Sequence, residues 1–307
     1  EKSTLSQMPI TISSQAMQMD ESTLEEQMQS NNEKKDKYPS EKVVKPTETI
    51  MEKMVHKNNI TSDYLEYINN IDKNLLSGIS FLKKTGLNLV TVDKDNNYKK
   101  IDMSNSMSYQ LFPTRTSEEE TGVVEDNYDV LAGNIDSKEL GLILAVDSKN
   151  GVDKSLIESL GFASTENISF DDILNKEIKL ITNNDYYKQL GANFIPDSNY
   201  EKMYNSTNSI TVKIKAIIRG KEDKEMFTNQ AAIFYTGALV DKIISINKES
   251  DIVKKQEELD YNILTGASFD DTTTKNDILA YLGADEIPAV IYLYPKDFKS
   301  KDKITSY

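Results

Sequence analysis

The chain of 307 residues contains no cysteine, no tryptophan and one histidine, His56. Without cysteine it can hold no disulfide framework, no thiol nucleophile and no cysteine-ligated zinc. One histidine excludes a multi-histidine metal site, and Ser-His-Asp chemistry would have to run through that single imidazole. A chain without cysteine suits the cytosol and the outside of a bacterial cell equally, so the compartment stays open.

Basic charge is also scarce, since 36 Lys and Arg residues face 50 Asp and Glu residues and the formal net charge is −14. This balance argues against nucleic-acid binding and against adsorption to anionic lipid headgroups. Apolar runs such as 141–146 are far shorter than the ~20 residues that cross a bilayer. We find no signal-peptide pattern, and because the first residue is Glu1 rather than methionine we expect an excised or processed segment.

The length allows about two domains, and the apolar share of 38% predicts folded domains with some solvated, poorly ordered chain. An opening with the alternation of a strand contains Leu5, Met8, Ile10 and Ile12. The polar stretch 13–58 that follows is predicted to be partly loop or disordered.

Residues 60–92 form the clearest local unit. Apolar side chains recur every three or four residues from Tyr64 to Leu82, which predicts a long helix that ends at Gly86. Thr61 or Ser62 is the expected N-cap. A strand over 87–92 follows, so that the opening strand, the helix and this strand would make a β-α-β unit.

The middle of the chain predicts strands separated by loops and one short helix. The helix covers 153–160 and ends at Gly161, and the half-buried strand 210–219 has the alternation typical of antiparallel sheets. The other strands are predicted over 140–147, 177–182 and 231–235. This arrangement favours an α+β insert over a doubly wound sheet.

The last third is predicted to be helical and then to close with a strand. One or two helices precede Leu259, and Thr274 with Asp277 forms a capping box for a helix that ends at Gly283. A strand covers 289–294, and Ser300 is the expected cap of a final helix.

Acidic motifs are the main candidates for chemistry. The sequence Ser-Phe-Asp-Asp occurs at 169–172 and 268–271, where helix capping explains the acidic pair better than catalysis does. The spacing in 93–97 resembles the start of a calcium loop, but an EF-hand needs glycine at its sixth position, where Tyr98 stands, so a polar turn is favoured. The run 118–120 is predicted to be a solvated loop.

His56 has no neighbouring nucleophile motif, and a surface histidine is the favoured interpretation. Phosphate-binding glycine loops and zinc-hydrolase motifs are also missing. We therefore predict no catalytic, metal-binding or cofactor-binding residues, and the residues that would bind a substrate stay unknown.

Several short stretches together resemble one known family. They are the segments 5–12, 60–68, 128–133, 214–219, 232–236, 264–266 and 291–298, in the family's order and spanning nearly the whole chain. In this pattern the chain resembles the extracytoplasmic domain of MacB-like and FtsX-like ABC transporter permeases, specifically the ATP-binding/permease proteins of Gram-positive bacteria. Residues 13–58 carry none of the likeness.

The resemblance implies a particular division of the chain. A membrane-proximal, porter-like subdomain with β-α-β units would be formed by 1–105 together with 284–307. A β-rich, sabre-like subdomain would be inserted over 106–236, and 237–283 would be a helical connection. The fold class expected is thus α+β.

The resemblance also implies a role without chemistry in this segment. Such a domain lies between the first two membrane spans, on the extracytoplasmic face of a multi-pass membrane protein, and couples cytoplasmic ATP hydrolysis to substrate export or to a partner outside. Its partners would be its own transmembrane helices and ATPase domain, a second permease copy, and an accessory protein or peptide substrate. The alternative is an independent secreted or surface-anchored module that binds peptide or glycan. An enzyme that uses paired carboxylates such as Asp270 and Asp271 is the third possibility.

Overall fold

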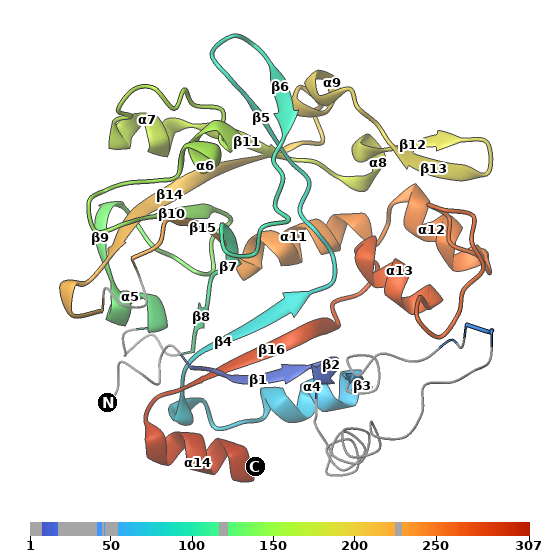
Figure 1. Cartoon of the computed structure of the whole chain (residues 1–307), viewed down its shortest axis with the longest axis horizontal. Helices are drawn as coiled ribbons and strands as arrows, with labels where there is room; N and C mark the ends of the chain where they lie inside the picture. The colour runs from blue at the N-terminus through green and yellow to red at the C-terminus, as the bar shows by residue number, and fades with distance from the viewer. Residues whose placement is uncertain (1–7, 18–41, 45, 47–54, 117–121, 225–228) are drawn as a thin grey trace.

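The computed structural model describes residues 8–17, 42–44, 46, 55–116, 122–224 and 229–307 (Figure 1). Helices and strands alternate irregularly within this part of the chain, and the predicted α+β class is confirmed. Within the stretch 13–58, the described ends form a short antiparallel pair of β2 (Gln15–Met17) and β3 (Val55–Lys57). None of the described helices is long and apolar enough to cross a bilayer.

A four-stranded sheet, here called the small sheet, gathers the two ends of the described chain. Its order is β1-β16-β4-β8, and β16 is antiparallel to both of its neighbours. The helices α4 and α14 pack against this sheet, below it in Figure 1, and enclose a core that includes Ile68, Ile291 and Ile304. The bounds are β1 (Ile10–Ser13), β4 (Leu76–Lys83), β8 (Thr114–Arg115), β16 (Pro288–Pro295), α4 (Ser62–Asn69) and α14 (Phe298–Ser306).

The long helix predicted from 61 to 86 is wrong beyond residue 69. Asn70 is the C-cap of α4, and after a short turn, η1 (Lys73–Leu75), the chain enters β4. Leu76 and Phe81 pair with β16 across this strand, so tertiary pairing overrides the helical spacing. Gly78 lets Val123 approach this strand closely, because a Cβ there would lie 3.0 Å from Cγ2 of Val123. The predicted β-α-β unit is therefore wrong in its second strand, because the strand at 89–92 belongs to the other sheet. β4 takes its place, parallel to β1 with β16 between the two.

An eight-stranded mixed sheet, here called the large sheet, fills the upper half of Figure 1. Its order is β6-β5-β11-β14-β10-β15-β7, and β9 pairs with part of β14. The pairs β10–β14 and β15–β7 are parallel, and the remaining pairs are antiparallel. The bounds are β5 (Leu89–Val92), β6 (Tyr98–Lys100), β7 (Tyr109–Leu111), β9 (Tyr128–Gly133), β10 (Leu142–Val146), β11 (Glu177–Leu180), β14 (Ile210–Gly220) and β15 (Ala232–Tyr235).

Both faces of β10 are buried because its side chains alternate between two cores. Leu142, Leu144 and Val146 join the core that α6, α7 and α11 cover, whereas Ile143 and Ala145 join the one beneath α5. The bounds of these helices are α5 (Val123–Asn127), α6 (Lys154–Ser159), α7 (Phe170–Asn175) and α11 (Gly237–Asn247).

A fourth core lies beside the large sheet and is held by a buried polar network. Asn183 donates through Nδ2 to Ser250 Oγ at 3.1 Å and to the carbonyl of Leu282 at 2.7 Å, and its own N–H donates to Asn247 Oδ1 at 2.9 Å. These bonds satisfy side chains that would otherwise be costly to bury. The elements around this core are α8 (Asn183–Tyr186), β12 (Tyr187–Leu190), β13 (Asn193–Pro196), α9 (Tyr200–Tyr204), α12 (Asp251–Glu258) and α13 (Lys275–Tyr281). Elsewhere, a short turn, η2 (Glu222–Lys224), follows β14.

Most local predictions in the second half of the chain are confirmed, including the strands β10, β11, β14 and β15 and the capping box of Thr274 with Asp277. The predicted cap of the last helix is wrong: Asp297, not Ser300, caps α14, because its carboxylate accepts the Ser300 N–H at 2.7 Å. The division into 1–105 plus 284–307, 106–236 and 237–283 stays a prediction.

Candidate functional site

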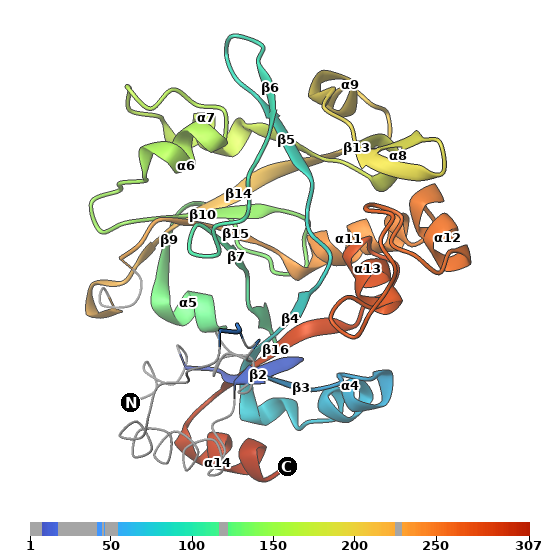
Figure 2. The ribbon, with the colours of Figure 1, turned by 45° about the vertical axis from the view of Figure 1, so that its right-hand side comes forward.

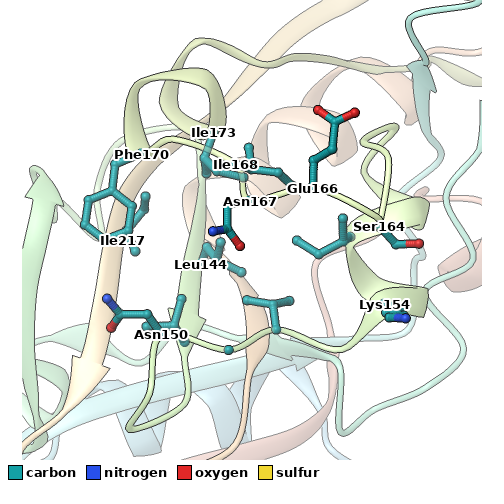
Figure 3. A pocket seen from close by; sticks show the side chains of 14 residues that line it. Leu144, Asn150, Lys154, Ser164, Glu166, Asn167, Ile168, Phe170, Ile173 and Ile217 are labelled. Carbon is teal, nitrogen blue, oxygen red and sulfur yellow. The ribbon is translucent and has the colours of Figure 1, made fainter.

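A cavity of about 290 Å³ opens between the large sheet and the helices α6 and α7 (Figure 3). We call it the α6–α7 pocket. Its floor consists of aliphatic side chains from two parallel strands, Leu144 and Val146 on β10 and Ile217 on β14. The side walls come from the loop after β10, from α6, from the segment 164–168 and from α7. Three separate parts of the chain therefore build one hollow.

A tight turn after β10 shapes one wall of the pocket. Asp147 Oδ1 accepts the N–H groups of Lys149 at 2.8 Å and Gly151 at 2.6 Å. Glycine at 151 leaves room for this carboxylate, because a Cβ there would lie 2.4 Å from Asp147 Oδ2. It also carries Asn150 in the left-handed region, with φ of 60°, and Asn150 Oδ1 accepts a hydrogen bond from Arg219 Nη1 at 2.8 Å.

The opposite wall is the start of α7. Ser169 is the N-cap, and its Oγ accepts the N–H of Asp172 at 3.1 Å. The capping role predicted for the first Ser-Phe-Asp-Asp sequence is thus confirmed. The cap fixes the first turn so that Phe170 and Ile173, three residues apart on one side of the helix, both line the pocket.

The rim of the pocket is polar. Figure 3 shows the carboxamide of Asn167 in the middle of the ring of lining side chains, with Lys154 and Glu166 nearer the edge. Ser164 donates to Glu158 Oε1 at 2.5 Å, whereas the side chains of Lys154, Glu166 and Asn167 have no hydrogen-bond partner among the described residues. These three groups are available to a ligand.

A second hollow of about 450 Å³ lies on the other side of the segment 166–168, which lines both cavities. Lys176 forms part of its wall, donates to the carbonyl of Val92 and lies 5.2 Å from the ring centre of Phe162. Burial lowers the pKa of Lys176, and the carboxylate of Asp93 opposes this shift. The lysine is therefore engaged by the protein itself.

Comparisons with protein-family models, with curated proteins and with solved structures found no significant match. The site therefore has to be argued from its own residues.

The acidic residues singled out from the sequence do not assemble into a site. The second Ser-Phe-Asp-Asp sequence, 268–271, starts no helix, and the predicted cap there is wrong. Asp270 Oδ1 instead accepts the N–H groups of Thr272 at 2.8 Å and Thr273 at 2.7 Å, which closes a loop turn before Thr274 starts α13. No described group of three or more Asp, Glu or His side chains could hold a metal ion.

Three candidates from the sequence remain: the turn at 93–97, His56 and the acidic run 118–120. Only the turn has described side chains. Asp93 Oδ1 accepts the N–H groups of Asp95 and Asn97 at 2.8 and 2.9 Å, so the polar turn predicted between β5 and β6 is confirmed. These bonds, led by the one from the Asn97 side chain, lower the pKa of Asp93. His56 pairs through its backbone with Ala16, and its side chain is not described, while 118–120 lies outside the described residues.

Sequence reasoning missed the α6–α7 pocket altogether. Its polar residues, Asn150 and Asn167, belong to no known motif, and its floor looks like ordinary strand core. The one local signal is the Asn-Gly dipeptide at 150–151, which marks a tight turn directly after a buried strand.

Proposed function

We propose that this chain is the extracytoplasmic domain of an ABC transporter permease of the MacB/FtsX-like type. The observation that supports this most is the position of the two ends of the fold. β1 lies antiparallel to β16, with Ile10 opposite Leu293 and Ser13 opposite Val290. The chain thus enters the fold beside the end of β16 from which it leaves towards α14 (Figure 2). A domain inserted between two membrane spans needs its entry and exit side by side.

The connections between the two sheets suit a part that transmits motion. The chain first leaves the small sheet through 84–88, touches it again at β8, and finally returns to it through α13 and 282–287. The first exit is tied to the final return. Lys84 pairs with Asp277 at 3.0 Å, Thr85 donates to the carbonyl of Tyr281 at 3.2 Å, and Lys83 donates to the carbonyl of Glu286. Movement of the small sheet would therefore carry the rest of the domain with it.

In this proposal the domain does no chemistry and takes no cofactor. ATP would be hydrolysed by a separate cytoplasmic domain, and the membrane helices would pass the resulting movement to the small sheet. The partners would be those membrane helices, the ATPase domain, a second permease copy and a substrate or accessory protein on the outer face of the bacterial cell membrane. The finer fold assignment, a porter-like small-sheet part with a sabre-like insert, belongs to the same proposal.

Site-specific labelling of the full-length protein in its own cells tests the location. Because this chain has no cysteine, Leu190→Cys introduces one thiol into it, on the β12–β13 hairpin, where Leu190 is 61% exposed. We expect a membrane-impermeant maleimide to label this variant in intact cells, and Ala145→Cys, at a position with 0% exposure, to be labelled only after denaturation. The parent protein controls for thiols elsewhere. Labelling of Leu190→Cys only after the cells are broken would contradict the proposal.

The α6–α7 pocket favours a second candidate, an independent surface module that binds peptide or glycan, since a binding module needs a ligand site but no paired ends. Both candidates predict labelling from outside. They differ in how the domain is tethered: the transporter domain is held to the membrane at both ends, whereas a secreted or anchored module is held at one end or at neither.

A further inference from the structure

The α6–α7 pocket combines an aliphatic floor with two carboxamides that keep hydrogen-bonding groups unused, and this combination points to one class of ligand. Leu144, Val146 and Ile217 at the floor offer only carbon to an occupant, with Ile157 and Ile168 beside them. An aliphatic side chain fits such a surface, because burying it removes apolar area from water. The cavity of about 290 Å³ is just smaller than the ~300–1,000 Å³ of small-molecule sites, which suits one side chain with its adjoining backbone.

Above the floor, the carboxamide of Asn167 lies in the middle of the lining side chains and that of Asn150 at their edge (Figure 3). Asn167 has no hydrogen-bond partner among the described residues, and Asn150 uses Oδ1 for Arg219 while its Nδ2 has no described partner. A carboxamide offers a donor and an acceptor together, as a peptide group does, so the two are complementary. The rim carries one positive charge, on Lys154, and one negative charge, on Glu166. Because these charges cancel, the pocket favours a neutral ligand over an ion.

The second hollow indicates that the ligand continues past the pocket. Glu166, Asn167 and Ile168 form the shared wall, so a chain that crosses this wall reaches both cavities. An extended peptide rises ~3.3 Å per residue and points alternate side chains in the same direction, which suits two adjacent hollows. A compact ligand would use only one of them.

We propose that the α6–α7 pocket binds an extended polypeptide segment, with one aliphatic side chain on the floor and its peptide groups hydrogen-bonded to Asn167 and Asn150. The assignment goes beyond the transporter proposal and narrows the peptide-or-glycan alternative to one ligand class. It stands without the transporter proposal, since it concerns binding by the chain itself.

Methyl NMR on the 307-residue chain, labelled at isoleucine, leucine and valine, tests the site. The probe is a capped nine-residue peptide of glycine and serine with a central leucine, and the comparison peptide has aspartate in its place. We expect saturable shifts of the Leu144, Ile168 and Ile217 methyl groups, with a dissociation constant below about 1 mM. The aspartate peptide should bind at least about tenfold more weakly, because it leaves the floor unfilled.

Variants at Asn167 separate binding from folding. Asn167→Ala should weaken binding about fivefold, and Asn167→Phe should abolish it by placing a ring in the pocket. In the second variant the floor methyl groups should show ring-current shifts without any peptide, which reports a folded protein with a filled pocket. The matched control is Asn193→Ala, an exposed asparagine on the β12–β13 hairpin on the other side of the molecule, and it should bind as the parent does (Figure 1).

Three results would overturn the assignment: no saturable shift with the leucine peptide, equal binding of the leucine and aspartate peptides, or unchanged binding in Asn167→Phe. A titration with chitotetraose checks the competing ligand class. Floor shifts with this sugar and none with the peptide would make the pocket a glycan site instead.

Discussion

Ile291 holds the centre of the small sheet, and its truncation is the sharpest test of how that sheet is stabilised. It has 0% exposure, pairs with Ile12 on one side and Phe81 on the other, and belongs to the same core as Ile304 of α14. Replacement by alanine removes three carbon groups at ~0.8 kcal/mol each, or roughly 2.4 kcal/mol of transfer free energy. With the cavity left behind, the free energy of unfolding should fall by about 2–5 kcal/mol.

Urea unfolding followed by circular dichroism measures this change for Ile291→Ala. The matched control is Ile195→Ala, which makes the same substitution at a site that is 39% exposed on β13 and should cost less than about 1 kcal/mol. If the two variants unfold at the same urea concentration, the small sheet does not depend on the core described above, and the reasoning fails.

Three further predictions concern other parts of the fold. Burial raises the pKa of Tyr128 to about 12, so the neutral phenol stabilises the fold fully below pH 10, and this stabilisation is lost as the pH rises towards 12. The free energy of unfolding should therefore fall between pH 9 and pH 12, and urea titrations at these two pH values should show that Tyr128→Phe makes this fall smaller by up to about 2.7 kcal/mol. Gly133→Ala should destabilise the protein by more than about 1 kcal/mol in thermal unfolding, because φ is +75° and the Cβ would lie 2.0 Å from the Lys215 carbonyl oxygen. Ser169→Ala should cost about 1 kcal/mol, whereas Ser268→Ala, in the same four-residue sequence without a helix, should cost almost nothing in the same assay.

Sequence patterns located elements well wherever local signals and burial agree. Leu142–Val146 is uniformly apolar and becomes a strand buried on both faces, and Thr274 with Asp277 forms the expected capping box. The same patterns failed at Leu76–Lys83, because the spacing of apolar residues there fits a helix while β16 supplies a pairing partner more than 200 residues away. Such long-range pairing leaves no mark on local periodicity.

The α6–α7 pocket could not be predicted from the sequence for a related reason. Its floor combines Leu144 with Ile217, which meet only because β10 and β14 are parallel neighbours. Asn167 is a candidate binding residue only because its side chain lies in a cavity, which the sequence does not show. Asparagine is common in loops and by itself indicates no site. The acidic motifs drew attention instead, but capping and turn formation account for Ser169–Asp172 and for Asp270.

The central claim, that the domain is held to the outer face of the membrane at both of its ends, can be tested by cutting it free. Protease sites are introduced into the full-length protein next to residue 1, next to residue 307, or at both places, and the protease is added to intact cells. We predict release of a soluble 34.7 kDa fragment only when both sites are present. Release through one site alone would indicate a module with a single anchor, and cleavage only in broken cells would place the domain inside, so either result would contradict the account.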